Sequence, residues 1–239
     1  GFTCALLDDG SIKCWGQDNE GQRGDGGGYG SDIRSPPSSA ITLPAGRTAT
    51  QISAGQFHVC ALLDDASVVC WGKNANGQLG DGSTSDRTAP VATSSFGTGH
   101  SVSFVSAGYD HTCALLTDGG VRCWGYNNKG QLGDGTSTDR STPPTTDVNL
   151  GTGYTAIGIS SGGVHTCAML QDGDMKCWGS QNSGQLGDNS NFASSHTTTP
   201  VFVQGTRVWQ EGEFLTSPDV SGATCGISPA LPTGMSLTS

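Results

Sequence analysis

Short apolar runs, each bounded by glycine and other turn-forming residues, recur along the chain. Cys4-Ala-Leu-Leu7 and Ser11-Ile-Lys-Cys14 flank the polar tripeptide Asp8-Asp9-Gly10, and similar pairs of runs follow further along. Runs of this length between turn residues are typical of strands, and a three-residue loop ending in glycine is typical of a hairpin. The pattern predicts an all-β fold built from short antiparallel hairpins.

The hairpins belong to a repeat of more than fifty residues. Its first cysteines are Cys4, Cys60, Cys113 and Cys167, which lie 56, 53 and 54 residues apart. The repeated segments read TCALLDDGSIKCWGQDNEGQRGDG, VCALLDDASVVCWGKNANGQLGDG, TCALLTDGGVRCWGYNNKGQLGDG and TCAMLQDGDMKCWGSQNSGQLGDN. Further short runs, at 49–53, 90–93, 101–105, 154–158 and 200–203, bring each unit to about four strands. Such a period favours four-stranded β-propeller blades over helical solenoid units.

Cysteines occupy facing positions in each expected hairpin. They form pairs ten residues apart: Cys4 and Cys14, Cys60 and Cys70, Cys113 and Cys123, and Cys167 and Cys177. Pairing Leu7 with Ser11 places Leu6 opposite Ile12, and it places the two cysteines of the unit at a spacing that a disulfide can bridge. In the second unit Ala66 takes the glycine position, so that loop is expected to be strained or to use another turn.

The alternative to four disulfides is a set of buried free thiols, which a reducing cytosol would favour. Zinc binding is not expected, because the cysteines do not form CxxC-like pairs. Four facing pairs in four hairpins favour oxidation, and therefore a secreted or cell-surface location.

Composition narrows the classes of partner. The 239 residues include 38 glycines, and the net charge is −10 with a pI near 4.6. The 11 Lys and Arg are scattered, so a nucleic-acid partner is not expected. No apolar stretch approaches the ~20 residues of a membrane span. The sequence contains no nucleophile elbow, phosphate loop or zinc-protease motif, so the chain is predicted not to be an enzyme and to need no cofactor or metal.

Several features together resemble the repeats of the regulator of chromosome condensation family: AGxxHTCAL, DGxVxCWGxNxxGQLGDG and a later proline before a strand. The resemblance covers residues 1–204 and implies a propeller of four-stranded blades, usually seven. Four units are present, the first incomplete at its start, so further blades of a longer chain or another chain would complete the ring. The cysteine-bearing units are similar to secreted and surface members of the family, one of which inhibits β-lactamases through a propeller face.

The last part of the sequence departs from the repeat. Residues 205–222 are expected to be a linker or closing strand. Residues 223–239 include Ser228-Pro-Ala-Leu-Pro-Thr-Gly-Met-Ser-Leu237, which resembles the start of the immunoglobulin-like domains found in surface proteins. Cys225 has no partner within the repeats and is expected to pair beyond them.

Three sets of residues are candidates for chemistry. His58, His111 and His165 recur at one register, where blade-to-blade hydrogen bonding is favoured over a catalytic or metal-binding row. Trp15, Trp71, Trp124 and Trp178 follow the second cysteines, where packing over a disulfide is favoured over a sugar-binding row. The loops 81–86 and 134–139 are rich in oxygen, but turn formation explains them without calcium.

These features predict a non-catalytic structural and interaction module of a large extracellular protein, assembling with copies of itself or with neighbouring domains of the same long chain. A secreted propeller that binds a protein or glycan through its loop face is the alternative. The Ser/Thr-Pro stretches could carry O-linked sugars.

Overall fold

The computed structural model describes residues 1–30, 32–189 and 195–205, and this part contains strands and no helix. It belongs to a compact unit, Gly1–Val208, which is distinct from a second unit, Trp209–Ser239. The predicted immunoglobulin-like segment, Cys225 and all but Gly205 of the predicted linker lie outside the described residues. The strands are β1 (Phe2–Leu6), β2 (Ile12–Gly16), β3 (Ala49–Ala54), β4 (His58–Leu63), β5 (Val68–Gly72), β6 (Arg87–Ala92), β7 (Val102–Ala107), β8 (His111–Leu116), β9 (Val121–Gly125), β10 (Ala156–Ser161), β11 (His165–Leu170), β12 (Met175–Ser180) and β13 (His196–Phe202).

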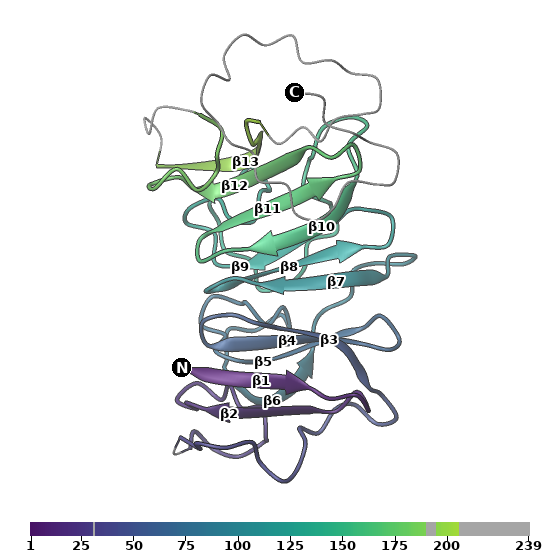
Figure 1. Cartoon of the computed structure of the whole chain (residues 1–239), viewed down its shortest axis with the longest axis vertical. Coiled ribbons are helices and arrows are strands. Elements are labelled where there is room, and N and C mark those ends of the chain that lie inside the picture. The colour runs from purple at the N-terminus through teal and green to yellow at the C-terminus, as the bar shows by residue number, and fades with distance from the viewer. Residues whose placement is uncertain (31, 190–194, 206–239) are drawn as a thin grey trace, which may run out of the picture. The chain divides into compact units, whose positions relative to one another are not determined.

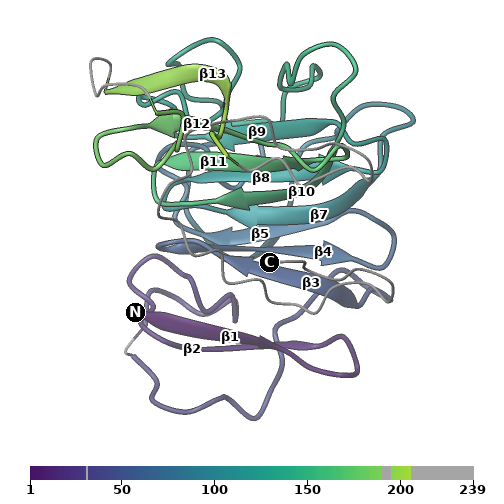
Figure 2. The ribbon, with the colours of Figure 1, turned by 45° about the horizontal axis from the view of Figure 1, so that its top comes forward.

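The strands form antiparallel sheets that follow one another in chain order (Figures 1 and 2). We call them blades 1 to 4: β1-β2, β3-β4-β5-β6, β7-β8-β9 and β10-β11-β12-β13. The prediction of an all-β fold made of propeller blades is therefore confirmed.

Blades 2 and 4 have the expected four strands, whereas the described part of blades 1 and 3 has fewer. Blade 1 starts with β1, as expected for a unit that is incomplete at its start, and in both blades an isolated bridge marks the place of the last strand, at Gly16–Ile33 and Gly125–Arg140. Both segments contain a Pro-Pro pair, and the second proline cannot donate to the ladder. After the bridge, the next backbone hydrogen bond to the sheet comes two residues later in these segments than in blade 2. These bonds run from Ile41 N to Ile12 O and from Val148 N to Val121 O. The extra length and the missing donor explain the absent strand.

The hairpins have the predicted register. Cys4 faces Cys14, Leu6 faces Ile12, and Leu7 N donates to Ser11 O. Disulfides join Cys4–Cys14, Cys60–Cys70, Cys113–Cys123 and Cys167–Cys177, with Cα–Cα distances of 4.0 to 4.1 Å. Gly10 takes a left-handed conformation with φ of 79°, and Ala66 keeps the same turn with φ of 64°. The second hairpin therefore uses the strained form of the expected turn.

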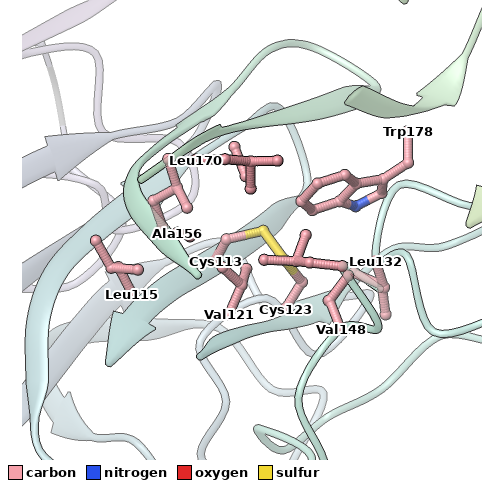
Figure 3. Close-up of a cluster of buried hydrophobic side chains, with 12 residues drawn as sticks. Cys113, Leu115, Val121, Cys123, Leu132, Val148, Ala156, Leu170 and Trp178 are labelled. Atoms are coloured by element: carbon pink, nitrogen blue, oxygen red, sulfur yellow. A yellow bond between two sulfur atoms is a disulfide. The ribbon is translucent and has the colours of Figure 1, made fainter. Parts of the chain in front are cut away.

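The hydrophobic core lies between neighbouring blades. Each described cluster combines the disulfide of one blade with the tryptophan of the next, as Figure 3 shows for Cys113–Cys123 and Trp178. Trp124 packs in the same way with Cys60 and Cys70. Because burial of these large rings requires two blades, each blade depends on its neighbour for much of its hydrophobic stabilisation.

Candidate interaction surface

The histidines occupy the junctions between blades. His58 Nε2 lies 2.9 Å from Thr112 Oγ1 in the next blade, and Thr112 Oγ1 donates to Gln78 O at 2.8 Å. Because the hydroxyl proton goes to that carbonyl, His58 must be the donor and carries its proton on Nε2. The next junction repeats this arrangement. His111 Nε2 lies 3.0 Å from Thr166 Oγ1, which donates to Gln131 O at 3.0 Å. The predicted blade-to-blade role of these two histidines is confirmed.

Burial sets the protonation of this row. Desolvation lowers the pKa of His58 to about 4 and that of His111 to about 3, and it also lowers the pKa of half-buried His165. Fully buried neutral imidazoles within a hydrogen-bonded junction stabilise the packing and are inaccessible to a substrate. In the described ranges, no group of three or more His, Cys, Asp or Glu could hold a metal ion.

The tryptophans complete the same junctions. Trp124 Nε1 donates to Gln78 O at 3.0 Å, and Trp178 Nε1 donates to Gln131 O at 2.9 Å. Each ring lies on a glycine of the preceding blade: a Cβ added at Gly80 would be 2.6 Å from Trp124 Nε1. The side chains of Trp71, Trp124 and Trp178 are fully buried, so the sugar-binding alternative is wrong for these three.

The oxygen-rich loops are filled by an amide. Asn74 Nδ2 donates to Asp81 Oδ1 at 3.1 Å, to Ser83 O at 3.2 Å and to Ser85 O at 3.0 Å. Arg87 pairs with the other carboxylate oxygen, Asp81 Oδ2, at 2.7 Å. The amide N–H groups thus occupy the place that a cation would need. Asn127 does the same for the loop 134–139. The sequence signal for this contact is an Asn four residues after the second cysteine.

In blade 1 an ion pair takes the place of this asparagine amide. Asp18, which is almost fully buried, stands at the position of Asn74 and contacts Arg23 Nε at 3.0 Å through Oδ2. Arg23 itself stands where blade 2 has the buried Leu79. The two substitutions are therefore linked: a buried carboxylate requires the nearby guanidinium.

A second set of residues missed by sequence reasoning ties blades 2 and 3 together. Lys73 Nζ and Gln78 Nε2 both donate to Asp110 Oδ1, at 3.0 and 2.9 Å. At the equivalent position blade 2 has Phe57 and blade 4 has Val164, so this polar tie is specific to one junction. It could not be recognised as part of the repeat.

The hairpin loops of all four blades lie on one side of the described sheets. We call this side, with loops 7–11, 63–67, 116–120 and 170–174, the loop face. The first strand of a blade is bonded to the hairpin loop of the blade before it. Ala49 N, at the start of β3, donates to Gly10 O, and Ala156 N, at the start of β10, donates to Gly119 O. Aspartates gather on this face: Asp8, Asp9, Asp64, Asp65, Asp118, Asp172 and Asp174.

Local hydrogen bonds lower the pKa of three loop-face carboxylates. The Ser11 hydroxyl and backbone lower the pKa of Asp9, and Ser67 does the same for Asp65. The pKa of Asp118 is lowered first by the hydrogen bond from Gly120 N, at 3.1 Å. Arg47 is the cation closest to loop 63–67, with its Nε 3.0 Å from Asp65 Oδ2. The loop face is therefore predominantly acidic and exposed.

The loop face also contains a polar pocket of about 450 Å³ between the hairpin of blade 3 and the connection to blade 4. Its lining includes Asp118, Gly120, Asp147 and Tyr154. A smaller pocket of about 220 Å³ lies at the equivalent place between blades 1 and 2, beside Asp9 and Arg47. Ligands usually bind in concave sites, although most such sites are lined mainly by apolar side chains, unlike the larger of these two pockets.

Comparison with known proteins agrees with this arrangement. The family model described as the regulator of chromosome condensation (RCC1) repeat matches residues 1–22, 49–78, 102–131 and 156–185. A second RCC1 repeat model matches residues 65–115 and 118–169, and together the two cover more than half of the chain. The chain belongs to the RCC1 repeat family.

Several proteins with RCC1 repeats are similar to this chain. The ultraviolet-B receptor UVR8 of Arabidopsis thaliana is 37% identical over 177 residues, covering 74% of this chain and 38% of the receptor. The probable E3 ubiquitin-protein ligase HERC3 of Homo sapiens is 34% identical over 165 residues, covering 69% of this chain and 15% of the ligase. The chain thus spans less than half of either relative.

Solved structures support the fold. Human WBSCR16 superposes with a TM-score of 0.73 at 23% identity, covering 85% of this chain and 50% of that protein. Yeast RCC1 (Prp20), in its structure with Kap60, gives a TM-score of 0.69 at 20% identity, covering 86% of this chain and 47% of that protein. RCC1 propellers of this kind are interaction modules, and the described part of this chain consists of their repeats.

Proposed function

We propose that this chain is a non-catalytic module that binds a protein partner through its loop face. The observation that supports the proposal is the different placement of two groups of polar and aromatic residues. Most of the repeated histidines, tryptophans and asparagines are buried in contacts within and between blades, whereas most of the exposed aspartates gather on the loop face. One aspartate of each loop also stabilises its turn by accepting a hydrogen bond from the backbone two residues on. Gathering like charges on one face nevertheless costs stability, and recognition or solubility would offset that cost.

The relatives support a binding role. Yeast Prp20 has been solved with Kap60 bound, so a protein that contains this fold binds another protein. UVR8 is a receptor, and the ligase HERC3 shares only 15% of its length with this chain. We therefore propose binding, and no ligase activity, for the repeats themselves.

We further propose that the module acts outside the cell or at its surface. The support is the disulfide in each hairpin, because four such bridges persist in oxidising compartments. A partner there could be a different protein or a copy of this chain, and O-linked sugars on the Ser/Thr-Pro segments would be compatible with the same location.

The test compares two variants that change net charge equally on opposite faces. The loop-face variant is Asp8→Asn, Asp64→Asn and Asp172→Asn. Its control is Ala75→Lys, Asn128→Lys and Asn182→Lys, at exposed equivalent positions in the turns after the second cysteines of blades 2 to 4.

Proteins captured from the medium or surface fraction of the source cells by each variant are quantified by mass spectrometry. We expect the loop-face variant alone to lose the specific partner. Equal capture by both variants would overturn the proposal. Concentration-dependent self-association in sedimentation that the loop-face variant retains would instead indicate assembly through another surface and would also overturn it.

A further inference from the structure

The junction between blades 2 and 3 and the junction between blades 3 and 4 have equivalent hydrophobic cores. Each core combines the disulfide of one blade with the tryptophan of the next, Trp124 in the first case and Trp178 in the second. Both junctions also share three polar contacts: an indole N–H to a glutamine carbonyl, a histidine to a threonine, and a backbone N–H to a serine hydroxyl. Because these contacts are matched, the remaining polar contacts determine which junction is more stable.

The first strands of the blades differ at one position. Gln51 in β3 bonds twice to blade 3, since its Nε2 donates to Val105 O at 2.8 Å and its Oε1 accepts from Val105 N at 2.9 Å. Phe104 stands at the equivalent position of β7 and keeps 40% of its surface exposed. A phenyl ring has no hydrogen-bonding group, so position 104 cannot bond in this way to Ile159, the equivalent of Val105 in blade 4.

The second difference lies before the repeated histidine. Asp110 of blade 3 accepts hydrogen bonds from a lysine and a glutamine of blade 2. At the next junction Val164 stands in the place of this aspartate, and Tyr126 stands in the place of the lysine. The equivalent glutamine, Gln131, is almost fully buried, and its Nε2 has no hydrogen-bond partner in the described part of the chain. An unpaired buried amide destabilises the junction that contains it.

The balance of these contacts favours opening between blades 3 and 4. This junction has one additional bond, from Ser161 Oγ to Ser106 O at 3.2 Å. It lacks the two bonds of Gln51 and the two bonds of Asp110, one of which is an ion pair. A neutral hydrogen bond changes an equilibrium constant about fivefold, and a bond to a charged group changes it more.

We propose that the fold contains a hinge between blades 3 and 4, at which blade 4 moves away from blade 3 as a folded unit while blades 2 and 3 stay joined. The four-stranded ladder and the Cys167–Cys177 disulfide hold blade 4 together during this movement. Local opening of one cooperative unit is common in proteins built from repeats. Loops 116–120 and 170–174 belong to the two blades, so the hinge changes the shape of the loop face. It does not depend on which partner that face binds.

Two indole protons test the hinge, because each is buried and bonded across one junction. Trp124 Nε1 donates to Gln78 O, and Trp178 Nε1 donates to Gln131 O. Their exchange with deuterium is followed by NMR in the 239-residue protein under native conditions. We expect the protection factor of the Trp178 indole to be at least about tenfold lower than that of Trp124. Backbone amides bonded within the β11–β12 ladder should be better protected than the Trp178 indole, because blade 4 stays folded.

Two variants transplant the missing contacts into the weaker junction. Phe104→Gln supplies the amide that blade 2 has, and it should raise the protection of Trp178 about tenfold. The double variant Tyr126→Lys and Val164→Asp supplies the ion pair and an acceptor for the unpaired glutamine amide, and it should raise the protection of Trp178 by a similar factor. Neither variant should change the protection of Trp124 more than twofold.

The matched reverse change is Gln51→Phe, which should lower the protection of Trp124 about tenfold and leave Trp178 unchanged. The proposal falls if Trp178 is as well protected as Trp124, or if both transplants leave its protection unchanged. Exchange of the β11–β12 amides together with the Trp178 indole would also overturn it, because blade 4 would then unfold instead of moving as a unit. Retained chemical shifts away from the substituted positions show that each variant is folded.

Discussion

One residue, Ala66, has a backbone conformation that its side chain disfavours. Its φ is 64°, and the equivalent residues Gly10, Gly119 and Gly173 have φ between 79° and 88°. A left-handed conformation costs an alanine about 1–2 kcal/mol, of which the extra chain entropy of glycine in the unfolded state offsets a part. We therefore expect Ala66→Gly to raise the free energy of unfolding by about 0.5–1 kcal/mol in urea titrations.

The reverse change provides the control for that prediction. Gly119→Ala should lower the free energy of unfolding, because the new alanine would have a left-handed backbone conformation and its methyl group would clash with Thr155 Cγ2. A loss of stability on Ala66→Gly would show that the strain assigned to this hairpin is absent.

The Asp18–Arg23 pair in blade 1 can be tested by a double-mutant cycle. Arg23→Leu leaves the carboxylate of Asp18 buried without its ion-pair partner, which should cost about 3 kcal/mol. Adding Asp18→Asn recreates the Asn and Leu combination of blades 2 and 3 and should recover most of that loss. Urea unfolding of the two single variants and the double variant measures the coupling. If the double variant were no more stable than Arg23→Leu, the two substitutions would be independent.

Among the elements, the hairpins could be predicted from sequence and the junctions only in part. The alternation of residues fixes which side chains face each other across a short loop, so the Cys4–Cys14 register followed directly. The junction contacts join residues about 50 apart, such as His58 and Thr112, and their partners depend on how blades pack. The pocket between blades 3 and 4 depends on Gly120, and this departure from the repeat has a meaning only once Asp147 is placed beside it. The last strand expected in blades 1 and 3 is absent, because a second proline and two extra residues interrupt the ladder there.

The disulfides differ in access from blade to blade. Cys60, Cys70, Cys113 and Cys123 are at most 1% exposed, whereas Cys4 and Cys167 are partly exposed. Because a reductant must reach a sulfur to attack it, we expect Cys4–Cys14 and Cys167–Cys177 to be reduced before the bridges of blades 2 and 3 under native conditions. Limited phosphine treatment, alkylation and peptide mass spectrometry give the order of reduction. Reduction of Cys113–Cys123 before Cys4–Cys14 would contradict the burial seen in blade 3.

For the molecule as a whole, stability depends on keeping the junctions neutral. His58 and His111 have pKa values of about 4 and about 3 in the folded protein, because burial disfavours the charged imidazole. In the unfolded chain both return to about 6.5. The unfolded state therefore binds protons first, so the stabilisation is complete above pH 6.5 and is lost progressively as the pH falls toward 4. Each histidine contributes a slope of about 1.4 kcal/mol per pH unit in this window.

The prediction is a fall in the free energy of unfolding between pH 6.5 and 4.5, measured by urea titration at several pH values. In the variant His111→Gln, the amide can still donate to Thr166 Oγ1 but does not titrate, so the slope should drop by about half. The His196→Gln variant, at a partly exposed histidine of β13, leaves the buried row intact and should keep the full slope. The carboxylates of Asp9, Asp65 and Asp118, whose pKa values are lowered, stay ionised in the folded state throughout this range. An unchanged slope in His111→Gln would mean that the acid sensitivity arises elsewhere. A halved slope would show that cohesion between blades depends on imidazoles kept neutral by the same burial that makes them structural.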